Sequence, residues 1–189
     1  MAKQNEAPKT KVITGLVRFS YVHVWEPEAI GEGSDKKYSV SLIIPKSDKE
    51  TLKEIEAAID AAKKAGKDSK FAGKIPATLK TPLRDGDEDR PDDEAYSKSF
   101  FINATSRTKP GVVDKNVKPI LDQDEFYSGC YGRASITFFA FNTNGNKGIA
   151  CGLNHVQKLK DGEAMGGRSS AESDFEGFKP LAEDPDDLF

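Results

Sequence analysis

Hydrophobic and polar residues alternate with a period of two over five segments of the chain, and this alternation predicts five β-strands. The predicted strands cover residues 12–25, 37–44, 99–108, 132–141 and 149–159. The first strand is rich in β-branched and aromatic residues, and both of its faces are partly apolar. It therefore suits a sheet that closes on itself or is covered on both sides.

A helical period replaces the alternation over residues 47–66. Apolar residues recur there at helical spacing, Ser47 or Asp48 can cap the amino end, and Gly66 can end the helix. Asn144-Gly145 signals a two-residue hairpin between the last two strands. We therefore predict a mainly β fold: a five-stranded oligonucleotide/oligosaccharide-binding (OB) barrel with one inserted helix, long loops and a disordered tail. From the pattern alone, a β-sandwich fits almost as well.

Composition divides the chain into three parts. Residues 1–11 are polar and contain proline, which predicts a flexible arm; residues 12–165 hold all the predicted strands; residues 166–189 are predicted to be a disordered acidic tail. Residues 172–189 hold seven carboxylates and one lysine, a net charge of −6, which leaves +3 for the rest of a chain whose formal charge is −3. Electrostatics therefore favours contact between the body and the tail.

Few residues of the chain are suited to catalysis. The two histidines, His23 and His155, lie within predicted strands, and the sequence lacks the common metal-binding, phosphate-loop and nucleophile-elbow motifs. We predict no catalytic residue, no cofactor and no metal site. Cys130 and Cys151 are predicted to be small buried hydrophobic residues rather than a disulfide. The sequence has neither a signal peptide nor an apolar run long enough to cross a membrane, so we expect a cytoplasmic protein.

Residues 81–95 form a turn-rich segment crowded with carboxylates. Their spacing is not that of a calcium-binding loop and no histidine is nearby, so a solvated loop is the preferred interpretation. The alternative is a metal-dependent nuclease that uses acids of this loop, namely Asp85, Asp87, Glu88, Asp89, Asp92 and Asp93.

Binding of single-stranded nucleic acid requires flat aromatic faces for the bases and cations for the phosphates. Alternation places Tyr131, Arg133 and Phe139 on one face of the fourth strand, opposite small apolar residues. It places Phe101 and Arg107 on one face of the third strand, which leads into Lys109. The predicted nucleic-acid-binding residues are Arg18, Trp25, Phe101, Arg107, Lys109, Lys115, Tyr131, Arg133 and Phe139. For each aromatic the competing interpretation is burial under the helix or a loop, and for Arg18 it is an ion pair within the protein.

The chain resembles phage-encoded single-stranded-DNA-binding proteins over nearly its whole length. The resemblance is carried by VRFSYVHVWEP, KYSVSLIIPKSDKETLKEIEAAI, KPGVVDKNVKPI, GCYGRASITFFAFN, GIACGLNHVQKLKDGE and the acidic tail that ends in DDLF. It implies an OB barrel that binds single-stranded DNA without sequence preference in replication or recombination, in the cytoplasm of a bacterial host and without catalytic residues.

The resemblance also implies that the tail recruits replication or recombination proteins such as a polymerase, helicase or recombinase. The residues expected to make that contact are Asp184, Asp186, Asp187, Leu188 and Phe189. The alternative to DNA binding is a protein-interaction or virion-associated structural module that uses its edges and tail on proteins alone.

Overall fold

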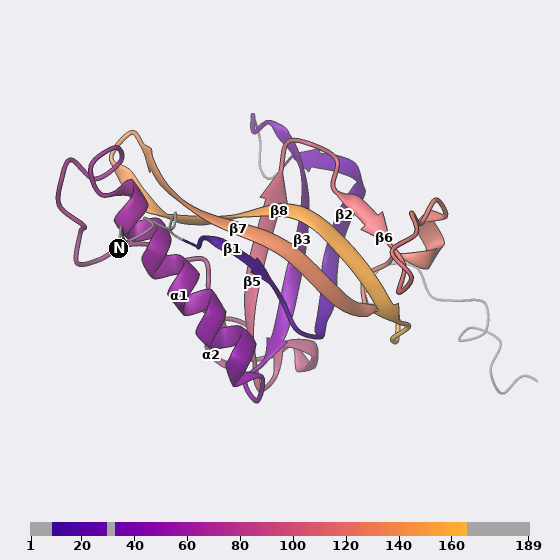
Figure 1. Cartoon of the computed structure of the whole chain (residues 1–189). Coiled ribbons are helices and arrows are strands. Elements are labelled where there is room, and N and C mark those ends of the chain that lie inside the picture. The colour runs from indigo at the N-terminus through magenta and orange to yellow at the C-terminus, as the bar shows by residue number, and fades with distance from the viewer. Residues whose placement is uncertain (1–8, 30–32, 166–189) are drawn as a thin grey trace, which may run out of the picture.

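The computed structural model describes residues 9–29 and 33–165, and they form a mainly β fold (Figure 1). The longer strands are β2 (Val17–Ala29), β3 (Lys36–Pro45), β5 (Ser99–Ser106), β7 (Tyr131–Thr143) and β8 (Asn146–Lys160). The short strands are β1 (Lys11–Ile13), β4 (Arg84–Asp85) and β6 (Gly111–Val113). The helical elements are α1 (Lys49–Gly66), α2 (Gly86–Asp89) and the 3-10 turns η1 (Glu94–Tyr96) and η2 (Gln123–Glu125).

Five strands close into a ring, which confirms the predicted five-stranded barrel. The order around the ring is β7-β2-β3-β5-β8, and the antiparallel hairpin pairing of β8 with β7 completes it. The junction of β5 with β8 is parallel and short, with Thr105 opposite Gly152. Outside the ring, β1 pairs with β7, β6 with β8 and β4 with β5.

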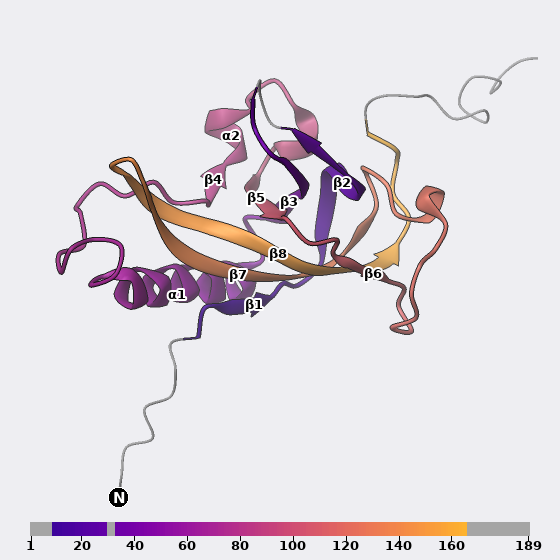
Figure 2. The same ribbon diagram turned by 90° about the horizontal axis from the view of Figure 1, so that it is seen from above.

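The barrel interior is filled by the apolar positions that the alternation predicted, among them Leu42, Ile102, Ile136 and Phe138. The helix α1 packs against β7 from one side, whereas α2 lies on the opposite side of the sheet (Figure 2). Asp48 caps α1, since its carboxylate accepts a hydrogen bond from the Thr51 amide at 3.2 Å. The inserted helix between the second and third long strands was predicted correctly.

Two details of the strands differ from the prediction. The single strand expected over residues 12–25 is two strands, β1 and β2. Between them, side-chain hydroxyls replace backbone carbonyls as hydrogen-bond acceptors: the Ala134 amide donates to Thr14 Oγ1 and the Gly15 amide to Thr51 Oγ1. In addition, β2 contains a bulge between Ser20 and His23. The predicted Asn144-Gly145 turn is confirmed, with both residues at positive φ.

The ends of the described chain adjoin the barrel. The Thr10 carbonyl accepts a hydrogen bond from the Phe138 amide at 3.0 Å, so the last residues of the predicted arm bind β7. The rest of the arm and the whole predicted tail, including Asp184, Asp186, Asp187, Leu188 and Phe189, lie outside the described residues.

Cys130 and Cys151 are both buried and unbonded to each other, as predicted. Burial raises the pKa of both thiols. In the part of the chain that the structure describes, no helix is long and apolar enough to span a membrane.

Candidate nucleic-acid interface

A groove of about 220 Å³ opens on the outer face of β2, β3 and β5. Its floor consists of small uncharged polar side chains, and the register sets Ser39 opposite Thr105 and Ser41 opposite Asn103. These residues lie on the outer face because their neighbours Val40, Leu42, Ile102 and Ala104 point into the barrel. Tyr21, His23 and Arg90 stand at the sides of the groove.

The segment 84–98, which holds β4, α2 and η1, bounds one end of this groove. Lys46 fastens it, with its ammonium 2.8 Å from a carboxylate oxygen of Asp85 and 2.8 Å from one of Asp87. The hydroxyl of Tyr96 donates to Ser41 Oγ at 3.1 Å. Hydrogen bonds to Asp85 and Asp87 raise the pKa of Lys46, and the lysine lowers the pKa of both carboxyls.

Four acidic residues of this segment make contacts within the fold. Asp85 and Asp87 bind Lys46, Asp89 lies 3.9 Å from Arg84, and Asp93 accepts a hydrogen bond from the Ala95 amide. Within the described residues no cluster of His, Cys, Asp or Glu side chains is arranged to hold a metal ion.

Phe101 requires a correction. It lies on the outer face of β5, as the alternation predicted, but it is only 1% exposed because segment 84–98 covers it. Its ring meets that of Tyr96 edge-on, with 5.1 Å between the centroids. A second small core therefore exists outside the barrel, and period-two alternation cannot reveal it.

Arg18 and Tyr131 lie together, but Arg18 is bound to the protein itself. Its Nε donates to the Gly129 carbonyl at 3.1 Å and its Nη2 to the Glu163 carbonyl at 2.7 Å. The guanidinium carbon is 5.4 Å from the centre of the Tyr131 ring, and Lys160 Nζ is 4.7 Å from the same centre. The internal partners of Arg18 are thus backbone carbonyls rather than a carboxylate.

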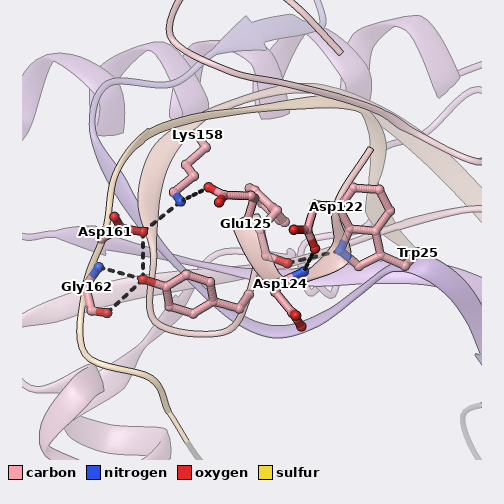
Figure 3. Close-up of polar contacts among 9 residues, drawn as sticks. Trp25, Asp122, Asp124, Glu125, Lys158, Asp161 and Gly162 are labelled. Carbon is pink, nitrogen blue, oxygen red and sulfur yellow. Dashed lines mark hydrogen bonds and ion pairs between the residues drawn. The ribbon is translucent and has the colours of Figure 1, made fainter. Parts of the chain in front are cut away.

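Trp25 and Lys109 form a second pair, with Lys109 Nζ 5.8 Å from the indole centre. The indole Nε1 donates to the Phe126 carbonyl at 3.0 Å, which joins Trp25 to the loop that precedes β7 (Figure 3). Trp25 is half-buried against the barrel core.

Polar contacts secure that loop to the end of β8. Lys158 binds Glu125 at 3.3 Å and Asp161 at 2.7 Å, and the Tyr127 hydroxyl donates to Asp161 at 2.9 Å (Figure 3). Burial by itself lowers the pKa of Lys158, but its hydrogen bonds to Asp161 and Glu125 raise it overall. The pKa of Asp161 is lowered by Lys158 first and by Tyr127 second.

The other predicted site residues are exposed. Arg107 is 4.0 Å from the exposed carboxylate of Asp35, and Lys115 lies in the loop after β6. Arg133 lines a separate hollow together with Ile13, Val117 and His155. Phe139 is 47% exposed on the outer face of β7, beside Gly152, as the alternation predicted.

None of the nine predicted nucleic-acid-binding residues lines the groove. Sequence reasoning also missed the aromatic and the cation that do line it, Tyr21 and Arg90. In a strand of strict alternation Tyr21 would share a face with the buried Phe19, but the bulge in β2 turns it outward. Arg90 belongs to the acidic segment 84–98, where one arginine among many carboxylates suggests a surface ion pair. No local signal in the sequence distinguishes either residue.

Comparison with known proteins agrees with this architecture. The family model described as the single-stranded-DNA-binding protein of Enterobacter phage Enc34 matches residues 10–189. Protein p50 of Acyrthosiphon pisum secondary endosymbiont phage 1 is 32% identical over 86% of this chain and 91% of its own.

Solved structures give the same result. The single-stranded DNA-binding protein of bacteriophage Enc34 in complex with ssDNA superimposes with a TM-score of 0.74 at 28% identity, over 83% of this chain and 90% of that one. The gp2.5 single-stranded DNA binding protein of bacteriophage T7 shares the fold, with a TM-score of 0.58 at 17% identity over 91% and 98%. The chain therefore belongs to the family of phage single-stranded-DNA-binding proteins represented by that of Enterobacter phage Enc34.

Proposed function

We propose that this protein binds single-stranded DNA without sequence preference and coats it during phage DNA replication or recombination. The observation that carries the proposal is the family match over residues 10–189, together with the related Enc34 structure that holds ssDNA. The matched family and solved structures are DNA-binding proteins rather than enzymes, in agreement with the absence of catalytic motifs from the sequence.

The surface supports binding through phosphates and base faces. Phe139 offers an exposed ring, and each base that stacks on an aromatic side chain contributes about 1–3 kcal/mol. The exposed cations Arg107, Lys109, Lys115 and Arg133 can contact phosphates. Such contacts do not read base identity, so we expect affinity to depend on salt more than on sequence.

We further propose that the acidic tail competes with DNA and recruits replication or recombination proteins through Asp184, Asp186, Asp187, Leu188 and Phe189. In support, Met165, the last described residue, lines a hollow that also includes Tyr21 and His23 of the groove. Its amide donates to the Ser128 carbonyl at 2.8 Å. A tail attached there has a high effective concentration at the groove.

The test is a fluorescence-anisotropy titration with a labelled oligo-dT of about thirty nucleotides, enough for at least one OB-fold site of roughly 4–16 nucleotides. Two salt concentrations and a duplex competitor are included. We expect tight binding that salt weakens and that duplex DNA does not compete away. No binding at low salt, with the tail also removed, would instead favour the protein-interaction module.

A further inference from the structure

The bulge in β2 presents Tyr21 to solvent in a backbone conformation that is costly for a non-glycine residue. Tyr21 has φ of 46°, in the left-handed region, and the next amide, of Val22, leaves the strand ladder to donate to Ser128 Oγ at 3.0 Å. The side chain is 53% exposed and stands between two hollows, of about 220 and 550 Å³. The fold thus holds an exposed aromatic ring that lines both hollows.

Arg90 lies against this ring without an anionic partner. Its guanidinium carbon is 5.3 Å from the ring centre of Tyr21, 4.9 Å from that of Tyr96 and 5.2 Å from that of Phe101. Within residues 9–29 and 33–165, Arg90 Nε is the one buried side-chain polar atom that lacks a hydrogen-bond partner. Its Nη1 reaches the Tyr21 hydroxyl at only 3.5 Å.

The carboxylates of the same segment are directed elsewhere. Asp85 and Asp87 bind Lys46, and Asp89 faces Arg84. Across the described residues, no carboxylate oxygen lies within 4.0 Å of an Arg90 nitrogen. Contact with aromatic rings stabilises a guanidinium, but a buried N–H without an acceptor is costly. Nε itself is closed off from solvent, so an anion from outside the described chain can reach Arg90 only at its terminal nitrogens, which have no carboxylate partner among the described residues.

We propose that Tyr21 and Arg90 form a base-and-phosphate clamp in the groove: a base stacks on Tyr21 and the adjoining phosphate accepts hydrogen bonds from Arg90. The groove floor of Ser39, Ser41, Asn103 and Thr105 carries no charge that would repel the strand. The acids at its margin are Glu28, which lies 3.3 Å from His23 Nδ1, and Asp93, which lines the adjoining hollow. An aromatic platform beside a cation is the arrangement that single-stranded nucleic acid requires. This inference rests on the proposed function, which it supplies with a specific site.

The test compares Arg90→Gln with Arg84→Gln, a matched control in the same segment whose guanidinium faces Asp89. Oligo-dT affinity is measured by anisotropy over a series of salt concentrations. We expect Arg90→Gln to weaken binding at least about tenfold and to reduce the slope of log K against log salt by about 0.7. Arg84→Gln should change neither quantity.

A second pair of variants tests the ring. Tyr21→Leu removes the ring and should bind oligo-dT about fivefold or more weakly, whereas Tyr21→Phe, which keeps the ring, should lose less affinity than Tyr21→Leu. If Arg90→Gln does not fold, the ¹⁵N resonance of Arg90 Nε–H in the wild type is followed instead, and it should shift on addition of oligo-dT.

The outcomes distinguish failure of the proposed DNA binding from failure of the Tyr21–Arg90 clamp alone. Wild-type protein that fails to bind oligo-dT overturns the proposed function itself. Wild-type protein that binds, while Arg90→Gln retains both affinity and salt slope or the Nε–H resonance stays unmoved, overturns only the clamp. In that case Arg90 serves to hold segment 84–98 on the sheet.

Discussion

At the scale of single residues, Phe139 and Phe101 both lie on the outer side of the barrel but differ in exposure, 47% against 1%. We expect Phe139→Ala to weaken oligo-dT binding by about 1–3 kcal/mol through lost stacking, with a stability change of about 0.5 kcal/mol or less. Phe101→Ala should instead destabilise the fold by about 3–5 kcal/mol. Thermal melts and anisotropy on both variants check this. A drop in melting temperature for Phe139→Ala with DNA affinity intact would contradict its role in stacking.

Arg18 leads to a different prediction, because its hydrogen bonds go to the Gly129 and Glu163 carbonyls. Arg18→Ala should reduce the free energy of unfolding by about 1–3 kcal/mol, since it leaves these carbonyls without their donor. The salt dependence of DNA binding should stay the same, because the guanidinium already has partners in the protein. Denaturant unfolding and a salt titration measure the two effects. A flatter salt dependence of DNA binding in an Arg18→Ala protein that remains stable would contradict this and would mean that Arg18 contacts a phosphate.

Which of these roles could be read from the sequence depends on what covers each side chain. Period-two alternation placed Phe101 and Phe139 correctly outside the barrel, since that placement follows from the interior positions of Ile102 and Phe138. It could not separate them, because the cover over Phe101 comes from segment 84–98 through long-range contacts. Tyr21 could not be placed for a related reason, since an extra residue in β2 between Ser20 and His23 reverses the face assignments that follow it, up to the next irregularity between His23 and Glu28.

At the scale of elements, segment 84–98 depends on the ion pairs of Lys46 with Asp85 and Asp87. The pKa of both carboxyls is lowered in the fold, so their contribution is present above the unfolded value of about 3.9 and is lost as pH falls through the folded values. The pKa of Lys46 is raised, so its contribution is present below about 10.4 and is lost as pH rises through the folded value.

We therefore expect Lys46→Met to speed amide hydrogen exchange in segment 84–98 near neutral pH, and the difference from wild type to shrink in acid below about pH 4. Because exchange itself slows in acid, protection factors are compared rather than raw rates. Lys63→Met is the control, since its contact with Asp60 on α1 is 3.8 Å long and of the weak surface kind. A difference that persists unchanged at low pH would mean that packing of Tyr96, not the ion pairs, holds the segment.

Element type and order were predictable to a greater extent than element boundaries. The helix and the long strands follow from periodicity and from caps such as Asp48, which act within a few residues. The break between β1 and β2 depends on Thr51, 36 residues from Gly15 in sequence, and the pairing of β6 depends on β8. Contacts between residues so far apart in sequence form only in the folded barrel, so they cannot be predicted from a local sequence pattern.

At the scale of the whole molecule, closure of the ring fixes where the described chain ends relative to the groove. The hairpin of β7 and β8 spans the barrel, and the chain after β8 passes Arg18 and reaches Met165 beside the groove. Periodicity allowed a sandwich as well as a barrel, because it specifies which faces are buried and not whether the last strand pairs with the third. The fold is a barrel because β8 pairs with two strands of the ring. It pairs with β5 where Thr105 lies opposite Gly152, and with β7 through the hairpin.

The exit of the chain beside the groove gives the tail prediction a geometric basis. Removal of residues 172–189 should tighten oligo-dT binding at low salt, because it removes a net charge of −6 that competes with phosphates for the same cations. The gain should fade as salt rises, since screening weakens the tail and the DNA alike. Anisotropy titrations at several salt concentrations measure both effects.

A variant with a tail of equal length, in which the seven carboxylates of residues 172–189 become amides, separates charge from length. If competition is electrostatic, this variant should bind oligo-dT as tightly as the truncated protein, even though Leu188 and Phe189 remain. If it binds like the wild type while the truncated protein binds more tightly, the apolar end of the tail is what occupies the groove. Equal affinity of all three proteins at low salt would exclude competition between tail and DNA, and the tail would then act on protein partners alone.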